Sequence, residues 1–183
     1  MSKPHPDRRE EPGDVVELLL ECHERIRRFA GLAQKLTRAK GSPDHEVRDV
    51  ASAVRRYFDE ALPLHVADEE ESVLPRLTTR VPELAPALER MVDEHREHQH
   101  DLASLVMLCG DIADDPRVLD EKRGELAELA QRLGDDFERH LAVEEREIFP
   151  QIDARLPLDE RKRMLAELRA RRADRDTTSA HAR

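Results

Sequence analysis

Residues 64–75 read LHVADEEESVLP, and residues 139–150 read RHLAVEEREIFP. Each stretch contains a His, a Glu four residues later, a second Glu directly after it, and a Leu-Pro or Phe-Pro pair at its end. The sequence before each stretch also repeats, because Cys-His at 22–23 is matched by Glu-His at 94–95. The chain therefore reads as two copies of a helix pair, each with a His on its first helix and a His-x-x-x-Glu on its second.

Helical geometry places six of these side chains on apolar faces. At about 100° per residue, each His shares a face with neighbouring Leu, Ile, Met or Phe residues. A Glu four residues after a His lies on the same face, whereas the next Glu turns about 140° away, so Glu70 and Glu145 are expected to point outward. The groups predicted to face the interior are His23, His65, Glu69, His95, His140 and Glu144.

These six groups indicate a metal centre. A buried carboxylate costs several kcal/mol unless it is paired or binds a metal, and one His on an apolar face is more often a hydrogen-bonded core residue. Four at matched positions, two of them followed by Glu, favour metal binding over a metal-free interaction module with buried polar networks. Because the set exceeds the four ligands of one Zn²⁺, and mixed imidazole and carboxylate ligands suit iron better than Mg²⁺ or Ca²⁺, two iron ions are predicted.

Four long helices carry these residues. Asp14 and Ser42 are the predicted N-caps of the first two, Gly41 and Gly110 are predicted stops, and Pro63 is expected to kink the second helix. Helices of this length with short connections predict an all-α, antiparallel up-down four-helix bundle with a short C-terminal fifth helix. The predicted helices cover about residues 15–40, 43–77, 84–110, 116–149 and 158–172.

The predicted organisation is one domain with two tails. Residues 1–13 contain three prolines and no apolar periodicity and are expected to be disordered, 14–155 form the bundle, and 156–183 form the fifth helix and a polar tail. The last helix is rich in Arg, but its acidic neighbours favour a solvated helix that packs on the bundle.

Composition excludes several classes of protein. Ala, Glu, Lys, Leu and Arg make up about half of the chain, which is typical of long helices. The formal net charge of −10 argues against nucleic acid as a partner. Neither a long apolar run nor a signal peptide is evident, so no membrane contact and a cytoplasmic location are expected. The two cysteines, Cys22 and Cys109, are expected to be packed thiols and not a disulfide.

The ordered set of six residues resembles the hemerythrin-like, or HHE cation-binding, family over roughly residues 14–155. The pattern in this chain is His23, His65-x-x-x-Glu69, His95 and His140-x-x-x-Glu144, with the helix-end prolines Pro75 and Pro150. The resemblance implies an up-down bundle around a non-haem di-iron site. It also implies terminal His ligands, two bridging Glu residues, and an oxo or hydroxo bridge between the irons.

The sequence departs from the oxygen-carrying members of that family. Those proteins have a His-x-x-x-His pair on the third helix, whereas Gln99 stands four residues after His95 here. They also have an Asp five residues after the His of the fourth helix, whereas Glu144 is the inward carboxylate here. Coordination positions are therefore open or filled by another group. His98 and Tyr57 are candidates, with a solvated rim His and ordinary aromatic packing as the alternatives.

Two functions are compatible with such a site. The first is a di-iron protein that binds, senses or reduces dioxygen, peroxide or nitric oxide, where a catalase-like or oxidase activity and a sensory role are both open. The second is iron storage, iron delivery or the repair of damaged iron centres. Relatives linked to repair carry additional N-terminal cysteines, which this chain lacks, so the first function is favoured.

Overall fold

Helices account for the architecture of the protein, for which a computed structural model describes residues 13–181, with side chains described as far as Arg175. No strand occurs within this range. The elements are α1 (Val15–Leu36), α2 (Asp44–Arg56), the π-helical η1 (Tyr57–Ala61), α3 (Leu62–Ala67), the π-helical η2 (Asp68–Val73), α4 (Leu74–Arg80), the 3₁₀ turn η3 (Pro82–Leu84), α5 (Ala85–Asp114), α6 (Val118–Val143), the π-helical η4 (Glu144–Ile148), α7 (Phe149–Arg155) and α8 (Leu158–His181).

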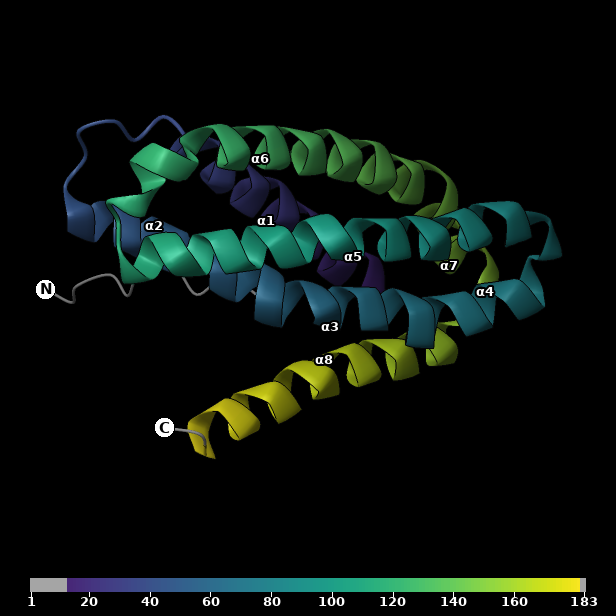
Figure 1. Ribbon diagram of the computed structural model, residues 1–183. Coiled ribbons are helices and arrows are strands. Elements are labelled where there is room, and N and C mark those ends of the chain that lie inside the picture. The colour runs from purple at the N-terminus through teal and green to yellow at the C-terminus, as the bar shows by residue number, and fades with distance from the viewer. Residues whose placement is uncertain (1–12, 182–183) are drawn as a thin grey trace, which may run out of the picture.

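Four of the resulting rods form a bundle (Figure 1). The segments from α2 to α4 run without a break as the second rod, and those from α6 to α7 form the fourth. The first rod, α1, packs against α2 and α6, and the third, α5, packs against the same two helices, which closes the ring. Consecutive rods run in opposite directions, so the predicted all-α up-down four-helix bundle is confirmed. The expected disorder of residues 1–13 falls almost wholly outside the described residues.

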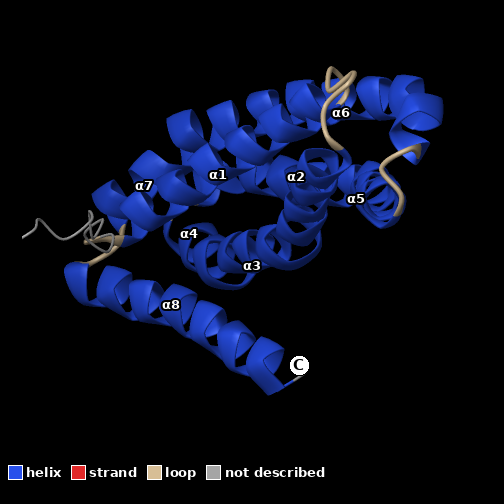
Figure 2. Cartoon of the chain, turned by 90° about the vertical axis from the view of Figure 1, so that its left-hand side faces the viewer, coloured by secondary structure: helices blue, strands red, loops and turns tan. Residues whose placement is uncertain are grey.

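The C-terminal helix forms a separate layer on one side of the bundle. Figure 2 shows α8 lying along α3 and α4, and it contacts α1 and η2. Its inner face buries Met164, Leu165 and Leu168. The helix continues to His181, so its predicted end at about Arg172 is wrong.

A layer of buried polar residues divides the hydrophobic core into two parts. One apolar cluster contains Ile26, Phe58 and Phe137, and the other contains Leu19, Phe149 and Met164. The polar residues between the clusters are His23, His65, Asp68, Glu69, Ser72, His95, His98, His140 and Glu144. A bundle with two separate apolar ends and a polar middle places the candidate site between the two apolar clusters.

The helix ends agree only in part with the predictions from sequence. Asp14 is the N-cap of α1, since its Oδ1 accepts a 2.9 Å hydrogen bond from the backbone N–H of Glu17. Ser42 is not a cap, because Pro43 occupies the N-cap of α2 without a side-chain hydrogen bond. Gly41 lies in the loop with a φ of 77°, after α1 has already ended. Gly110 does not end the third rod, because α5 continues to Asp114.

Three prolines lie inside rods and follow π-helical segments. Pro63, Pro75 and Pro150 each occupy the second residue of an α-helical stretch that begins directly after η1, η2 or η4. Proline lacks an N–H and clashes with the carbonyl group one turn earlier, and a widened turn accommodates both effects. At Pro63 the second rod passes from η1 into α3 through this local change and continues without a break. The second rod extends a little past its predicted end at about residue 77, to Arg80. The prediction that the fourth helix ends before Pro150 is wrong, because the chain stays helical to Arg155.

Cys22 and Cys109 are both buried thiols that form no disulfide, as predicted.

Across the described residues, no helix combines the length and the hydropathy that a membrane crossing requires.

Candidate metal centre

Each rod of the bundle contributes one His to the set of six predicted ligands. His23 comes from α1, His65 from α3, His95 from α5 and His140 from α6. The two remaining groups, Glu69 and Glu144, come from the π-helical segments η2 and η4. All six side chains are buried. The structure therefore brings together every residue predicted as a ligand.

The six side chains form two overlapping clusters that can each hold a cation. Within each cluster, one ligand atom from every residue lies within 4.8 Å of the ligand atoms of the others. Both clusters share Glu69 and Glu144, whereas each has its own pair of histidines. The first cluster, called position A here, has His23 and His65, and the second, called position B, has His95 and His140.

The carboxylate of Glu69 divides its two oxygens between the two positions. Its Oε1 lies 3.3 Å from Nε2 of His65 and 3.8 Å from Nε2 of His23. Its Oε2 lies 3.3 Å from Nε2 of His95. One oxygen therefore faces position A and the other faces position B.

Glu144 is arranged in the same way from the opposite rod. Its Oε2 lies 3.2 Å from Nε2 of His23 in position A. Its Oε1 lies 3.1 Å from Nε2 of His140 and 4.0 Å from Nε2 of His95 in position B. Two carboxylates thus span the same pair of positions, which is the arrangement that a bridged pair of cations requires.

Several polar atoms in the centre have no hydrogen-bond partner. They are Nε2 of His23, both ring nitrogens of His65, and all four carboxylate oxygens of Glu69 and Glu144. Buried polar groups are nearly always hydrogen-bonded, and a buried carboxylate without a partner is especially costly. The unpaired nitrogens and oxygens are also the donor atoms that a transition-metal ion takes. The residues present therefore fit a metal centre.

The protonation of the centre without metal follows from the same contacts. Burial lowers the pKa of His23, but the nearby carboxylates of Glu144 and Glu69 outweigh burial and raise that pKa to about 10. Burial is likewise outweighed at His140, whose pKa rises to about 9 beside Glu144. In His65 burial dominates and lowers the pKa to about 4. Without metal, protons on His23 and His140 therefore balance the two buried carboxylates at neutral pH.

A second set of carboxylates orients three of the four histidines through Nδ1. The pairs are His23 with Glu145 at 2.8 Å, His95 with Glu70 at 2.9 Å, and His140 with Glu94 at 2.6 Å. Such partners fix the tautomer of a ligating His and make its Nε2 a better donor to the metal. The prediction that Glu70 and Glu145 point outward is therefore wrong, since each reaches a His of a neighbouring rod.

The sequence pattern did not predict the contacts of these three carboxylates. Glu70 and Glu145 lie in η2 and η4, where the turn is wider than that of an ideal α-helix. The signal that could have identified them is the second Glu of each His-x-x-x-Glu-Glu stretch. Glu94 was visible only as the residue directly before His95.

The other candidate ligands lie elsewhere. The Tyr57 ring stacks on Phe29, and its hydroxyl donates to the carbonyl oxygen of Cys22 at 3.5 Å. Gln99 and His100 are exposed. His45 lies in α2. The two clusters therefore contain none of these side chains.

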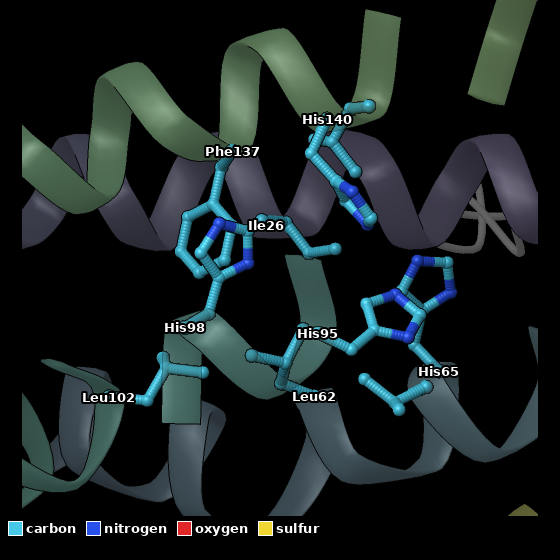
Figure 3. Close-up of a pocket in the computed structure, with 10 residues that line it drawn as sticks. Ile26, Leu62, His65, His95, His98, Leu102, Phe137 and His140 are labelled. Carbon is cyan, nitrogen blue, oxygen red and sulfur yellow. The ribbon is translucent and has the colours of Figure 1, made fainter. Parts of the chain in front are cut away.

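His98 is buried beside the centre. Its ring makes edge contacts with His140 at 5.6 Å and with Phe137 at 5.3 Å between ring centroids. It lines a mostly apolar cavity of about 30 Å³ together with Ile26, Leu62, His65, Val66, His95, Leu102, Phe137, His140 and Leu141 (Figure 3). It also lines an outer depression that contains Glu94, Glu97, Asp101 and Asp136. His98 is thus the residue that stands between the inner cavity and the surface.

A buried ion-pair cluster connects α8 to the segment that carries Glu69. Asp68 is fully buried, and its carboxylate lies 2.8 Å from Arg171 and 2.6 Å from Arg172. Arg171 also donates to Oγ of Ser72 at 2.9 Å. The last helix therefore supports η2 through contacts with Asp68 and Ser72.

Comparisons with known proteins agree with this geometry. The family model described as hemerythrin HHE cation binding domain matches residues 14–152, which include all six predicted ligands. A protein of Haemophilus influenzae described as uncharacterized is 26% identical over 135 residues, which cover 72% of this chain and 75% of that protein. The matched region of the family model ends before α8 begins at Leu158.

Proposed function

The chain belongs to the hemerythrin HHE cation-binding domain family, and we propose that it is a non-haem di-iron protein that binds, senses or reduces dioxygen, peroxide or nitric oxide. In this proposal position A and position B each hold one iron ion. His23 and His65 are the terminal ligands of one ion, His95 and His140 are those of the other, and an oxo or hydroxo group completes the bridge.

The observation that carries the proposal is the division of oxygens in Glu69 and Glu144. A single cation would draw both oxygens of a carboxylate, or one oxygen of each, toward one point. Instead, each carboxylate directs one oxygen to each His pair. The donor set of four imidazoles and two carboxylates favours iron over Mg²⁺ and Ca²⁺, which prefer shells of oxygen alone.

The cavity beside the centre has room for a small ligand, and histidines of both positions line it. Its volume of about 30 Å³ is enough for only one or two molecules of the size of water. Most of its lining is apolar, and three of the cluster histidines reach it. Such a space suits a diatomic molecule or peroxide and excludes a larger organic substrate.

The roles of the protein groups follow from their positions. Two iron ions that share bridging ligands supply a two-electron exchange with a small oxidant. The histidines and the two carboxylates hold the ions at fixed positions, because each side chain belongs to a packed rod and three imidazoles are oriented by carboxylates. The apolar lining keeps bulk water from the face that the ligand approaches.

The optical spectrum of the iron-loaded protein tests this function. We expect absorption in the near ultraviolet from the bridged ferric pair, its loss on reduction, and a new spectrum when oxygen, peroxide or nitric oxide is added to the reduced protein. Evolution of oxygen from peroxide would identify a catalase-like activity. Iron that is bound but spectrally indifferent to all three ligands would contradict the proposal and favour storage or delivery.

A further inference from the structure

The two metal positions differ in how their histidines are supported. In position B both imidazoles have a carboxylate at Nδ1, namely Glu70 for His95 and Glu94 for His140. In position A only His23 has such a partner, because Nδ1 of His65 is buried without a hydrogen bond. Position A therefore lacks one of the four supports that a symmetric site would have.

The sequence repeat explains why this support is missing. In the second copy, Glu94 precedes the His of α5 and reaches across to the His of α6. The equivalent residue of the first copy is Cys22, which precedes His23 on α1. A thiol cannot replace a carboxylate as a charged acceptor, and Cys22 Sγ instead accepts a 3.3 Å contact from Arg172. The difference between the two positions therefore comes from one repeat-related pair of residues, Glu94 and Cys22.

The missing carboxylate has an expected effect on metal affinity. A carboxylate at Nδ1 fixes the ring, selects the tautomer with a free Nε2, and increases its basicity. Loss of such a partner typically lowers metal affinity by about 10–100-fold. The imidazole of His65 receives none of these effects, although its Nε2 faces the same carboxylate oxygen as that of His23.

On the basis of the proposed di-metal function, we propose that position B binds a divalent cation more tightly than position A and fills first. Glu94 is the positioning residue that sets the difference, and Cys22 is its repeat-related counterpart. The resident pair of ions is then assembled in a fixed order, with the ion between His95 and His140 bound first.

Titration of the metal-free full-length chain with Co²⁺, followed by calorimetry and visible absorption, tests this inference. We expect two equivalents to bind in two steps. Repulsion between the two cations makes the second binding step weaker than the first in any two-metal site. The test is therefore how a mutation changes the ratio of the two dissociation constants, which is called the separation here. Glu94→Ala should weaken the first step by about 10–100-fold and narrow the separation. Glu94→Gln retains an oxygen acceptor, so it should weaken the first step less than Glu94→Ala does.

A variant that weakens position A should change the separation of the two binding steps in the opposite direction. Glu145→Ala removes the carboxylate from His23 in position A, so it should weaken the second step and widen the separation. Glu97 is exposed and lies about one turn from Glu94 on the same helix. Glu97→Ala removes the same charge as Glu94→Ala and is therefore the matched control. It should leave the affinities of both binding steps unchanged. A general loss of stability cannot move the separation in opposite directions in two variants.

Two results would overturn the inference. Separations that shift in the same direction in Glu94→Ala and Glu145→Ala, or that do not shift at all, would show that the outer carboxylates do not set the order of filling. A wild-type chain that binds fewer than two equivalents would instead contradict the proposed di-metal function, and the inference with it. The two failures are therefore distinguished by the stoichiometry of the wild type.

Discussion

The fully buried carboxylate of Asp68 lies 2.6 Å from the guanidinium group of Arg172, which comes from a helix outside the matched family region. Asp68 directly precedes Glu69 in η2. The contact therefore joins the last helix of the chain to the segment that carries one of the two shared carboxylates. It gives α8 a defined structural role in supporting the centre.

Removal of Arg172 is expected to destabilise the protein. Breaking a fully buried ion pair costs about 3–5 kcal/mol, but Arg172 is partly exposed and Arg171 still reaches Asp68, so we expect a loss of about 1–2 kcal/mol for Arg172→Ala. Urea unfolding of the metal-free protein measures this change. Arg163 on the same helix forms only an exposed pair with Asp159, so Arg163→Ala should cost less than about 0.5 kcal/mol. Equal losses in the two variants would refute the role assigned to Arg172.

Glu144 is expected to be required for both metal ions. Its two oxygens face different positions, so Glu144→Ala removes a donor from each. We expect less than one metal ion per chain in this variant after reconstitution with Fe²⁺, as measured by elemental analysis. Glu147 lies in the same π-helical segment but forms ion pairs at the surface, so Glu147→Ala should retain two. Full metal content in Glu144→Ala would show that this carboxylate is not a ligand.

Much of the centre is predictable from the sequence because the ligands in α-helices recur at the same spacing as the apolar residues of the buried face. The four histidines follow apolar faces at 100° per residue, and the structure places all four in one layer. The repeat adds Glu69 and Glu144 at matched spacing. These six positions depend only on local geometry and on the apolar pattern, which a single sequence contains.

The outer residues could not be predicted in the same way. Glu70 and Glu145 lie in widened turns, and the shift of direction in such a turn depends on how a proline is accommodated. The pairing of Asp68 with Arg171 and Arg172 joins residues about a hundred positions apart, and no periodicity signals it. The sequence likewise predicts that the last helix packs on the bundle, but not that its arginines reach Asp68.

Metal binding is expected to release protons. Without metal, the raised pKa values of about 10 for His23 and about 9 for His140 keep both imidazoles protonated at pH 7. A ligating imidazole must be neutral, so each has to lose its proton when the ions bind. Calorimetric titration in buffers of different ionisation enthalpy should therefore show release of about two or more protons per chain at pH 7. No dependence on the buffer would contradict the protonation inferred for the centre.

The stability of the metal-free protein is expected to fall at alkaline pH. The pKa values of His23 and His140 are above the unfolded value of about 6.5, so their contribution is complete below pH 6.5 and is lost as the pH rises towards 9–10. His65 acts in the opposite sense, because burial lowers its pKa to about 4. Its contribution to the free energy of unfolding therefore decreases as the pH falls from 6.5 towards 4. Thermal melting of the metal-free protein between pH 5 and 10 should show both declines.

The metal-loaded protein should differ from the metal-free protein over the alkaline part of this range. Its histidines are held neutral by the ions, so the decline between pH 7 and 9 should disappear. Free metal at about 100 times the dissociation constant of a position should also add about 2.7 kcal/mol to the free energy of unfolding for each position filled. Equal melting temperatures with and without metal would contradict the view that the six buried groups depend on cations.

The Mössbauer spectrum of the protein loaded with ⁵⁷Fe and oxidised tests the central claim most directly, because it reports both the number of iron ions and their coupling. We predict one spin-coupled, diamagnetic ferric pair that accounts for two iron ions per chain, since Glu69 and Glu144 each direct one oxygen to each position. Magnetically isolated ferric ions, or fewer than two ions per chain, would contradict the account.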